Sequence, residues 1–339
     1  MKNINVAIIG FGVMGRRYFN ILKQIKNFKV CYILDKKKNF LKNQKFKDDI
    51  NFFNDYSKVL KIKKIDLVIV STTANVRHKI IMSCIKNKIK YILAEKPLCK
   101  SLKEANEILR FSKKKHSKIS INFSRRYSAT YEKIKYHIKN KEIGDLKSIT
   151  IQMGGGQFGS NGSHMVDLIR FLMGEEALSV SGYLSKPINE NYRGKNFFDP
   201  GAFCMIKTKN GIRAIIDMLD DHSSPPTISI LGSKGRIFFD EREKFYSLYT
   251  REKKFFSEPV SKRISFKHKK IKCAKIDIIK DTRKNIMNLV SKDKIKSQIK
   301  DGFKSLEIIL ATHLSYQNKN RFIKIPITKK NYLKTFKFA

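Results

Sequence analysis

Ile4-Asn-Val-Ala-Ile-Ile-Gly-Phe-Gly-Val-Met-Gly15 is the stretch that decides the fold. The apolar run 4–9 reads as a buried strand, and a helical stretch begins at Arg16, just after the glycines. In such a turn the first glycine permits the tight bend, the second lets backbone approach a pyrophosphate, and the third lets helix and strand pack. Free N–H groups at the helix start then face the phosphates. This loop predicts a dinucleotide site formed by Gly10, Phe11, Gly12, Val13, Met14 and Gly15.

A carboxylate follows the second predicted strand, 30–34. Asp35 lies 20 residues beyond Gly15, where it can accept hydrogen bonds from ribose hydroxyls, as in NAD sites. Lys36–Lys38 come next, and a cation there could receive a 2′-phosphate. The sequence therefore favours NAD as the cofactor and leaves NADP open.

Strands and helices alternate up to about residue 123. Further strands are predicted at 66–70, 91–94 and 119–123, separated by helices at 76–88 and 101–115. This alternation predicts a parallel sheet covered on both faces. We expect an NAD(P)-binding α/β Rossmann domain over residues 1–122.

The pattern changes beyond residue 123. A helix at 127–139 precedes strands separated by turns, and a last helix at 301–316 precedes a short terminal strand. The predicted strands are 147–153, 202–208, 212–218, 228–231 and 236–239. We expect an α+β domain over 123–339 with a mostly antiparallel sheet, whose last helix is placed to pack back on the first domain. The basic segment 251–300 is too weakly periodic to predict an element.

The charge is large but dispersed. The chain has 339 residues, and 72 Lys+Arg against 29 Asp+Glu give +43. Lysine dominates, no run exceeds three like charges, and the composition is typical of AT-rich codons, so we expect no specific nucleic-acid partner. Five cysteines without a CxxC indicate a reduced chain. With no signal-peptide pattern and no long apolar stretch, we expect a cytoplasmic protein without membrane contact.

Two further motifs carry candidate chemistry. Ala94-Glu-Lys-Pro-Leu98 follows a predicted strand, so Lys96 emerges at the carboxyl edge of the sheet, where ligands bind and where a lysine can act as acid or base. Because lysine is abundant in this chain, the residue type alone is weak evidence, and the case for Lys96 rests on its position after the strand. Asn161-Gly-Ser-His164 opens an apolar-faced helix that ends at Gly174, which places His164 near the helix start. The other histidines show no HxH or HExxH spacing, so no metal site is predicted.

Taken together, these motifs resemble the Gfo/Idh/MocA oxidoreductase family over nearly the whole chain. The resemblance includes the glycine turn, Ser71-Thr-Thr-x-x-x-x-His78, Glu95-Lys96-Pro97, Asn122-Phe-Ser-Arg-Arg126 and Gly162-Ser-His164-x-x-Asp167. It implies a Rossmann domain followed by an α+β domain whose open sheet forms oligomer contacts, in a dimer or tetramer.

The resemblance also implies roles for individual residues. Lys96 would be the catalytic acid/base, and His164 would bind the same substrate and share the proton transfer. Thr72, His78 and Glu95 would lie near the nicotinamide half of the cofactor. Ser71, Thr73 and Lys96 would also bind the cofactor. The residues lining the substrate side would be Asn122, Arg125 and Arg126. A variable loop, 185–200, with Tyr192, Arg193 and Asp199, is expected to face the substrate.

One position departs from the family pattern. Dehydrogenases of this family have an aspartate four residues before the histidine, where this chain has Ser160, followed by Asn161. A serine cannot take up a proton near neutral pH. Lys96 and His164 would then suffice, with Ser160 or Asn161 as a hydrogen-bond donor; alternatively, the substrate or the chemistry differs. Asp167 is expected to be a structural or orienting group and not a replacement base.

The expected function is hydride transfer between NAD(P) and a hydroxyl or carbonyl of a sugar, inositol or nucleotide-linked sugar. Two alternatives stay open for this fold. One is an NAD-dependent glycosidase without net redox change, and the other is a cofactor-binding protein that has lost catalysis. A nucleic-acid-binding role is a further alternative that the charge alone motivates.

Overall fold

The computed structural model describes residues 3–36, 50–62, 64–185, 191, 194–259 and 266–338. The chain forms two compact units. The first comprises Met1–Ser124, Ile278–Phe303 and Tyr332–Ala339, and the second comprises Arg125–Asp277 and Lys304–Asn331. Two stretches that the sequence assigns to the second domain, 278–303 and 332–339, thus lie in the first unit. Over the described residues, every helix is too short or too polar to cross a membrane.

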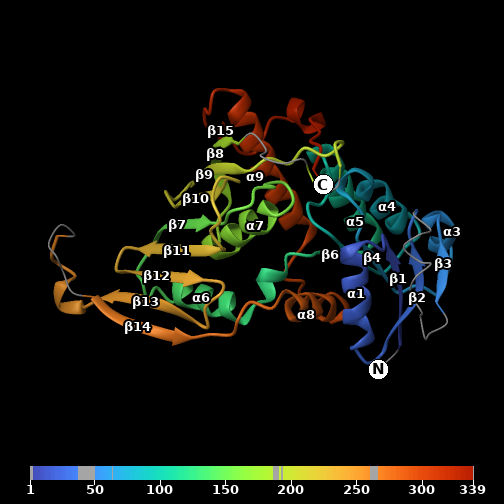
Figure 1. Ribbon diagram of the computed structural model, residues 1–339, viewed down its shortest axis with the longest axis horizontal. Helices are drawn as coiled ribbons and strands as arrows, with labels where there is room; N and C mark the ends of the chain where they lie inside the picture. The colour runs from blue at the N-terminus through green and yellow to red at the C-terminus, as the bar shows by residue number, and fades with distance from the viewer. Residues whose placement is uncertain are drawn as a thin grey trace. The chain divides into compact units, whose positions relative to one another are not determined.

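A parallel sheet forms the centre of the first unit, with its described strands in the order β3-β2-β1-β4-β5-β6 (Figure 1). The strands are β1 (Ile4–Ile9), β2 (Phe28–Leu34), β3 (Asn51–Phe53), β4 (Leu67–Val70), β5 (Tyr91–Ala94) and β6 (Lys118–Ile121). The helices are α1 (Val13–Lys23), α3 (Tyr56–Leu60), α4 (Ala74–Lys86), α5 (Leu102–Lys115) and α8 (Ile278–Val290). β4 is buried along its whole length, as expected of a strand covered on both faces.

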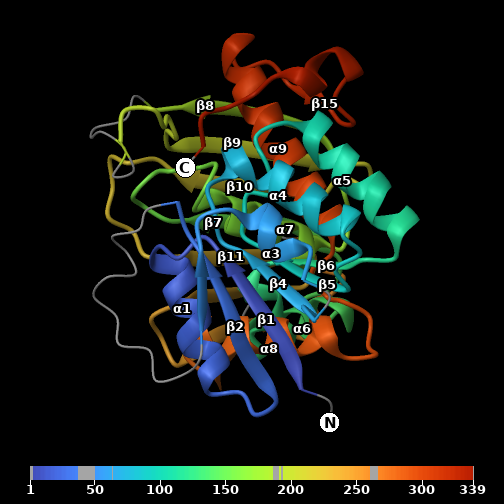
Figure 2. The same ribbon diagram turned by 90° about the vertical axis from the view of Figure 1, so that its right-hand side faces the viewer.

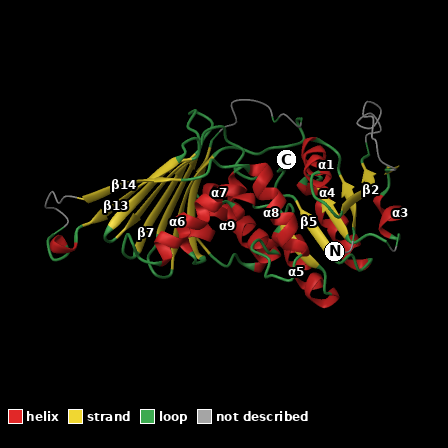
Figure 3. Ribbon diagram, turned by 90° about the horizontal axis from the view of Figure 1, so that it is seen from below, coloured by secondary structure: helices red, strands yellow, loops and turns green. Residues whose placement is uncertain are grey.

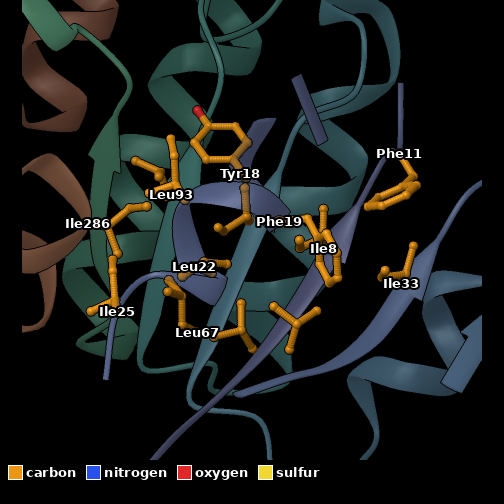
Figure 4. Packing of buried hydrophobic residues seen from close by; sticks show 14 of the residues in the cluster. Ile8, Phe11, Tyr18, Phe19, Leu22, Ile25, Ile33, Leu67, Leu93 and Ile286 are labelled. Atoms are coloured by element: carbon orange, nitrogen blue, oxygen red, sulfur yellow. The ribbon is translucent and has the colours of Figure 1, made fainter. Parts of the chain in front are cut away.

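Helices cover both faces of this sheet. Figure 2 shows α3, α4 and α5 on one side and α1 with α8 on the other. The α1 side contains a buried cluster in which Tyr18, Phe19 and Leu22 pack on strand residues and on Ile286 of α8 (Figure 4). The inward face of α8 also carries buried Thr282 and Asn285. These polar residues break the apolar periodicity, which explains why the sequence did not predict α8.

The second unit contains a mixed sheet, whose described strands run β14-β13-β12-β11-β7-β10-β9-β8-β15. The strands are β7 (Leu146–Gln152), β8 (Ala177–Leu184), β9 (Ala202–Thr208), β10 (Arg213–Met218), β11 (Thr227–Gly232), β12 (Gly235–Asp240), β13 (Phe245–Arg251), β14 (Phe266–Lys272) and β15 (Ile323–Lys324). Among these described strands, β7 and β10 pair in parallel and the other neighbours are antiparallel. The predicted fold class, a parallel Rossmann sheet followed by a mostly antiparallel sheet, is confirmed.

Helices α6 (Ala129–Lys139) and α7 (Gly162–Met173) lie along one face of the second sheet (Figure 3). α7 packs on β7 and β10. No described α-helix covers the opposite face, where side chains such as Met205, Leu231 and Phe238 are exposed. Helix α9 (Ile299–Gln317) begins in the first unit and continues into the second after Phe303.

Candidate active site

The register of the first sheet brings four predicted site residues to one edge. Ile9 pairs with Val70, Val70 with Ala94, and Ala94 with Ile121. The residues that follow these strand ends are Gly10, Ser71, Glu95 and Asn122. Because the strands are parallel, all four lie at the carboxyl edge, which is the ligand-binding edge of open α/β sheets.

The glycine turn fits a dinucleotide. Gly10 has φ +92°, and a Cβ there would meet the Ser71 backbone at 2.9 Å. A Cβ on Gly15 would collide with the Gly10 carbonyl, whereas a Cβ on Gly12 would meet nothing within 4 Å. Gly10 and Gly15 are therefore required by packing, and Gly12 leaves open space against its backbone, as close approach of a pyrophosphate requires. The open space at Gly12 fits the cofactor that the sequence predicts.

Asp35 and Ser71 hold the turn from either side. The Phe11 N–H donates to Asp35 Oδ2 at 2.7 Å, and Ser71 Oγ donates to the Gly10 carbonyl at 2.7 Å. Met14 is half-buried, while Val13, in the first turn of α1, is exposed. Lys36 is exposed, and Lys37 and Lys38 lie outside the described residues. The contact of Asp35 with the turn places its carboxyl group next to the predicted cofactor loop.

The loop after β4 contains a buried hydroxyl with no described partner. Thr72 Oγ1 makes no hydrogen bond to the residues that the structure describes, so it is available to a bound group. Thr73 Oγ1 instead contacts Asn75 at 2.5 Å. His78 Nε2 lies 2.9 Å from Glu107 Oε2 of α5, so this imidazole links two helices. A role of His78 at the nicotinamide stays a prediction.

Glu95 is the centre of a buried polar network. Its Oε1 accepts hydrogen bonds from the Tyr18 hydroxyl and from Asn122 Nδ2 at 3.0 Å, and its Oε2 accepts one from the Lys96 N–H at 3.3 Å. Burial, together with the Glu95 carboxylate, raises the pKa of Tyr18 well above its usual value, so Tyr18 stays a neutral donor. Thr282 extends the network to Asn122 at 3.5 Å. The backbone of Lys96 is thereby fixed to a carboxylate that is itself held from α1 and β6.

Arg77 is a site-forming residue that sequence reasoning missed. It is 2% exposed, and its guanidinium donates to the carbonyls of Thr72 and Pro97. These carbonyls belong to the loops after β4 and β5, so one cation joins the two segments that carry Thr72 and Lys96. Its position directly before His78 is the one signal in the sequence, and it is weak in a chain with 72 Lys+Arg.

The second unit carries the His164 segment. His164 lies in the first turn of α7, and its N–H donates to the Asn161 carbonyl at 3.1 Å. Ser160 Oγ contacts Gln157 Oε1 at 3.3 Å. Asp199, which the sequence places on a substrate-facing loop, is instead buried against the backbone of this segment. Tyr192 and Arg193 of the same loop lie outside the described residues.

Both arginines predicted on the substrate side have buried carboxylate partners. Arg125 Nε and Nη2 donate to Glu241 at 2.6 and 2.8 Å. Arg126 Nε and Nη2 donate to Asp167 at 2.7 and 2.8 Å. Two parallel hydrogen bonds in each pair fix the guanidinium plane. These contacts give Arg125 and Arg126 a structural role and bind Asp167 of α7 to Arg126; an orienting role for Asp167 stays a prediction. Contact of either arginine with substrate stays a prediction.

Metal ligands do not gather in the part of the chain that the structure describes. No three or more His, Cys, Asp or Glu side chains there are arranged to hold an ion.

Comparison with known proteins identifies both halves of the chain. Residues 4–123 match the oxidoreductase family with an NAD-binding Rossmann fold, and residues 148–238 match the Gfo/Idh/MocA C-terminal domain. The myo-inositol 2-dehydrogenase of Thermotoga maritima is 27% identical over 253 residues, covering 70% of this chain and 75% of that protein. The scyllo-inositol 2-dehydrogenase (NAD+) of Bacillus subtilis is 26% identical over 295 residues, covering 76% and 86%.

A solved structure shows the same fold. An oxidoreductase from Agrobacterium radiobacter, in complex with NAD+, L-tartaric acid and magnesium, superimposes with a TM-score of 0.78 at 17% identity, covering 96% of this chain and 99% of that one. The glycine turn, the Glu95-Lys96 loop and the two family matches lead to one conclusion. The chain belongs to the Gfo/Idh/MocA family of NAD-binding oxidoreductases.

Proposed function

We propose that the protein is an NAD-dependent dehydrogenase that oxidises a ring hydroxyl of inositol or of a closely related sugar. The observation that carries this proposal is the position of Lys96. It directly follows buried Glu95 at the carboxyl edge of the sheet that bears the glycine turn. Relatives named as inositol 2-dehydrogenases support the substrate class.

When bound at the glycine turn, NAD would supply the acceptor for the hydride of the carbinol carbon. Lys96 Nζ accepts the proton of the same hydroxyl, which leaves a ketone. Glu95 holds the Lys96 backbone, and Arg77 ties the loop after Lys96 to the loop after β4. The family resemblance assigns His164 to the same substrate, as a hydrogen-bonding partner that shares the proton transfer. Ser160, where relatives have an aspartate, would donate a hydrogen bond and take no proton.

A purified sample incubated with NAD and separate polyols tests the proposal. We expect NADH formation with myo-inositol or scyllo-inositol, and the same panel should include glucose and a nucleotide-linked sugar. Lys96→Met should lose turnover by about 10²-fold or more, the usual contribution of a general base, while NAD binding persists. Lys86→Met, which changes an exposed lysine of α4, is the matched control and should leave turnover unchanged.

The panel also separates the alternatives. NADH formation would exclude both the glycosidase without net redox change and the catalytically impaired protein. Failure of the wild-type chain to reduce NAD with every compound would contradict the dehydrogenase proposal. The relatives described above are named as dehydrogenases and give no support to a glycosidase.

We further propose that the uncovered face of the second sheet joins copies of this chain. Met205, Leu231 and Phe238 are 38%, 44% and 50% exposed, and Leu231 and Phe238 lie on neighbouring strands. An apolar face of this kind is a common oligomer contact. Light scattering should give a dimer or tetramer, and Phe238→Asp should shift it toward monomer. A monomeric wild-type protein would contradict this proposal.

A further inference from the structure

The buried carboxylate of Asp199 supports the backbone at Ser160, the position where relatives in the family carry an aspartate. Asp199 Oδ1 accepts a hydrogen bond from the Gly159 N–H at 2.6 Å, and Oδ2 accepts one from the Ser160 N–H at 2.9 Å. Asp199 is 6% exposed and lies 39 residues from Ser160 along the chain. The segment that should carry an aspartate at 160 is therefore bound by an aspartate from a distant loop.

The contacts of Asp199 continue to the start of α7. Ser163 Oγ donates to the Ser160 carbonyl at 2.6 Å, and the His164 N–H donates to the Asn161 carbonyl at 3.1 Å. One residue before Gly159, the Phe158 N–H donates to the Pro200 carbonyl at 2.9 Å. Successive backbone groups from 158 to 160 are thus tied to 199–200, and the next residues begin the helix that carries His164.

The chemistry of the contact requires a carboxylate. Both donors are backbone N–H groups, so each oxygen of residue 199 must accept. Hydrogen bonds to an ionised acceptor are stronger than neutral ones. An asparagine offers one accepting oxygen and one donating NH₂ group, so it would face one of the two N–H groups with a donor. Asp199→Asn therefore tests the contact with almost no change in volume.

We propose that Asp199 is the positioning residue for His164, and that it fixes the Gly159–Asn161 segment in place of the family aspartate missing at 160. This inference rests on the proposed dehydrogenase function. Asp199 acts through the loop backbone, which leaves proton transfer to Lys96 and His164.

The experiment compares Asp199→Asn with two controls in the same unit. Asp145→Asn removes the same charge from an exposed site paired with Lys141. Ile230→Val destabilises the buried sheet without touching the segment. For Asp199→Asn we expect kcat for the polyol to fall at least ten-fold, with NAD affinity within about two-fold of wild type, because the glycine turn belongs to the other unit. Both controls should keep near-wild-type kcat.

Hydrogen exchange gives a second readout that does not depend on turnover. In the wild-type protein the Gly159 and Ser160 amides should exchange at least ten-fold more slowly than unbonded loop amides, and Asp199→Asn should remove that protection. Fast exchange at both amides of the wild-type protein would overturn the proposal even if the variant failed to fold. A kcat of Asp199→Asn equal to that of Ile230→Val would also overturn it. If the wild-type protein oxidised no polyol, the dehydrogenase function would be refuted instead. Amide exchange would still test whether Asp199 hydrogen-bonds the Gly159–Asn161 segment.

Discussion

Replacing Arg126 by leucine tests whether this residue is part of the scaffold or binds substrate. Asp167 is 1% exposed, and Arg126 supplies its two short hydrogen bonds, at 2.7 and 2.8 Å. Asp167 Oδ1 also accepts longer hydrogen bonds from Arg170 Nη1 and Ser305 Oγ, both at 3.4 Å. Arg126→Leu therefore removes the bidentate partner of a buried carboxylate, and breaking such a buried pair costs about 3–5 kcal/mol.

Removing both charges should be less harmful than removing one. In Arg126→Leu/Asp167→Leu no buried carboxylate is left without its partner, and Arg170 keeps both of its bonds to Glu176, at 3.0 and 2.8 Å. Because replacing a buried pair by apolar residues is often close to neutral, we expect the double variant to regain most of the free energy lost in Arg126→Leu, about 3–5 kcal/mol.

Hydrogen exchange of the α7 amides is the assay, because it reports the local opening free energy of the helix that carries Asp167. The chain has no Trp, so circular dichroism in urea is the complementary probe of unfolding. A loss below about 1 kcal/mol for Arg126→Leu, or a double variant no more stable than the single one, would refute this reasoning. If stability recovered in the double variant while polyol KM remained raised, Arg126 would contact substrate as well.

Three further predictions follow from single positions. Gly12→Ala should leave the cofactor-free protein as stable as wild type, since its Cβ meets nothing within 4 Å, but weaken NAD binding by about ten-fold, or about 1.4 kcal/mol, in calorimetry; unchanged affinity would place the cofactor elsewhere. Arg77→Met should lower the unfolding free energy by about 2–6 kcal/mol, because the carbonyls of Thr72 and Pro97 each lose a donor worth about 1–3 kcal/mol, and a loss no larger than that of Lys86→Met would contradict it. Burial lowers the pKa of His313 from 6.5 to about 4, so the unfolded chain takes up a proton in that window before the folded chain does. Stability should then fall by about 3 kcal/mol as pH drops from 6.5 to 4, and His313→Leu should flatten this slope in urea titrations at several pH values; an unchanged slope would show that His313 does not cause it.

Residues at strand ends could be predicted because chain order alone places them. Glycine spacing after a buried strand predicted the dinucleotide turn, and the strand before Glu95 placed the Glu95-Lys96 loop at the carboxyl edge. The parallel register puts Gly10, Ser71, Glu95 and Asn122 at that edge together. Ser71 and Asn122 were expected at the site from the family resemblance, and the predicted strand 119–123 ran past Asn122, beyond the end of β6 at Ile121.

Residues that act through distant contacts could not be predicted in this way. Asp199 and Ser160 are 39 residues apart, and nothing in either local sequence indicates the pairing. Arg77 is one cation among many, and only its burial distinguishes it. The strand β14 was missed for a different reason. Nearly all of its residues are exposed, so it lacks the alternation of apolar and polar residues by which a half-buried strand is recognised.

Hydride transfer is the central claim, and isotope labelling tests it most directly. Wild-type protein would be incubated with NAD and with myo-inositol or scyllo-inositol deuterated at the carbinol carbons, and the nicotinamide product analysed by mass spectrometry. The dehydrogenase proposal predicts NADH carrying one deuterium from the substrate, formed by the wild-type chain and by Lys86→Met but not by Lys96→Met. Absence of deuterated NADH with both inositols and with labelled sugars, from a protein shown to bind NAD, would contradict it.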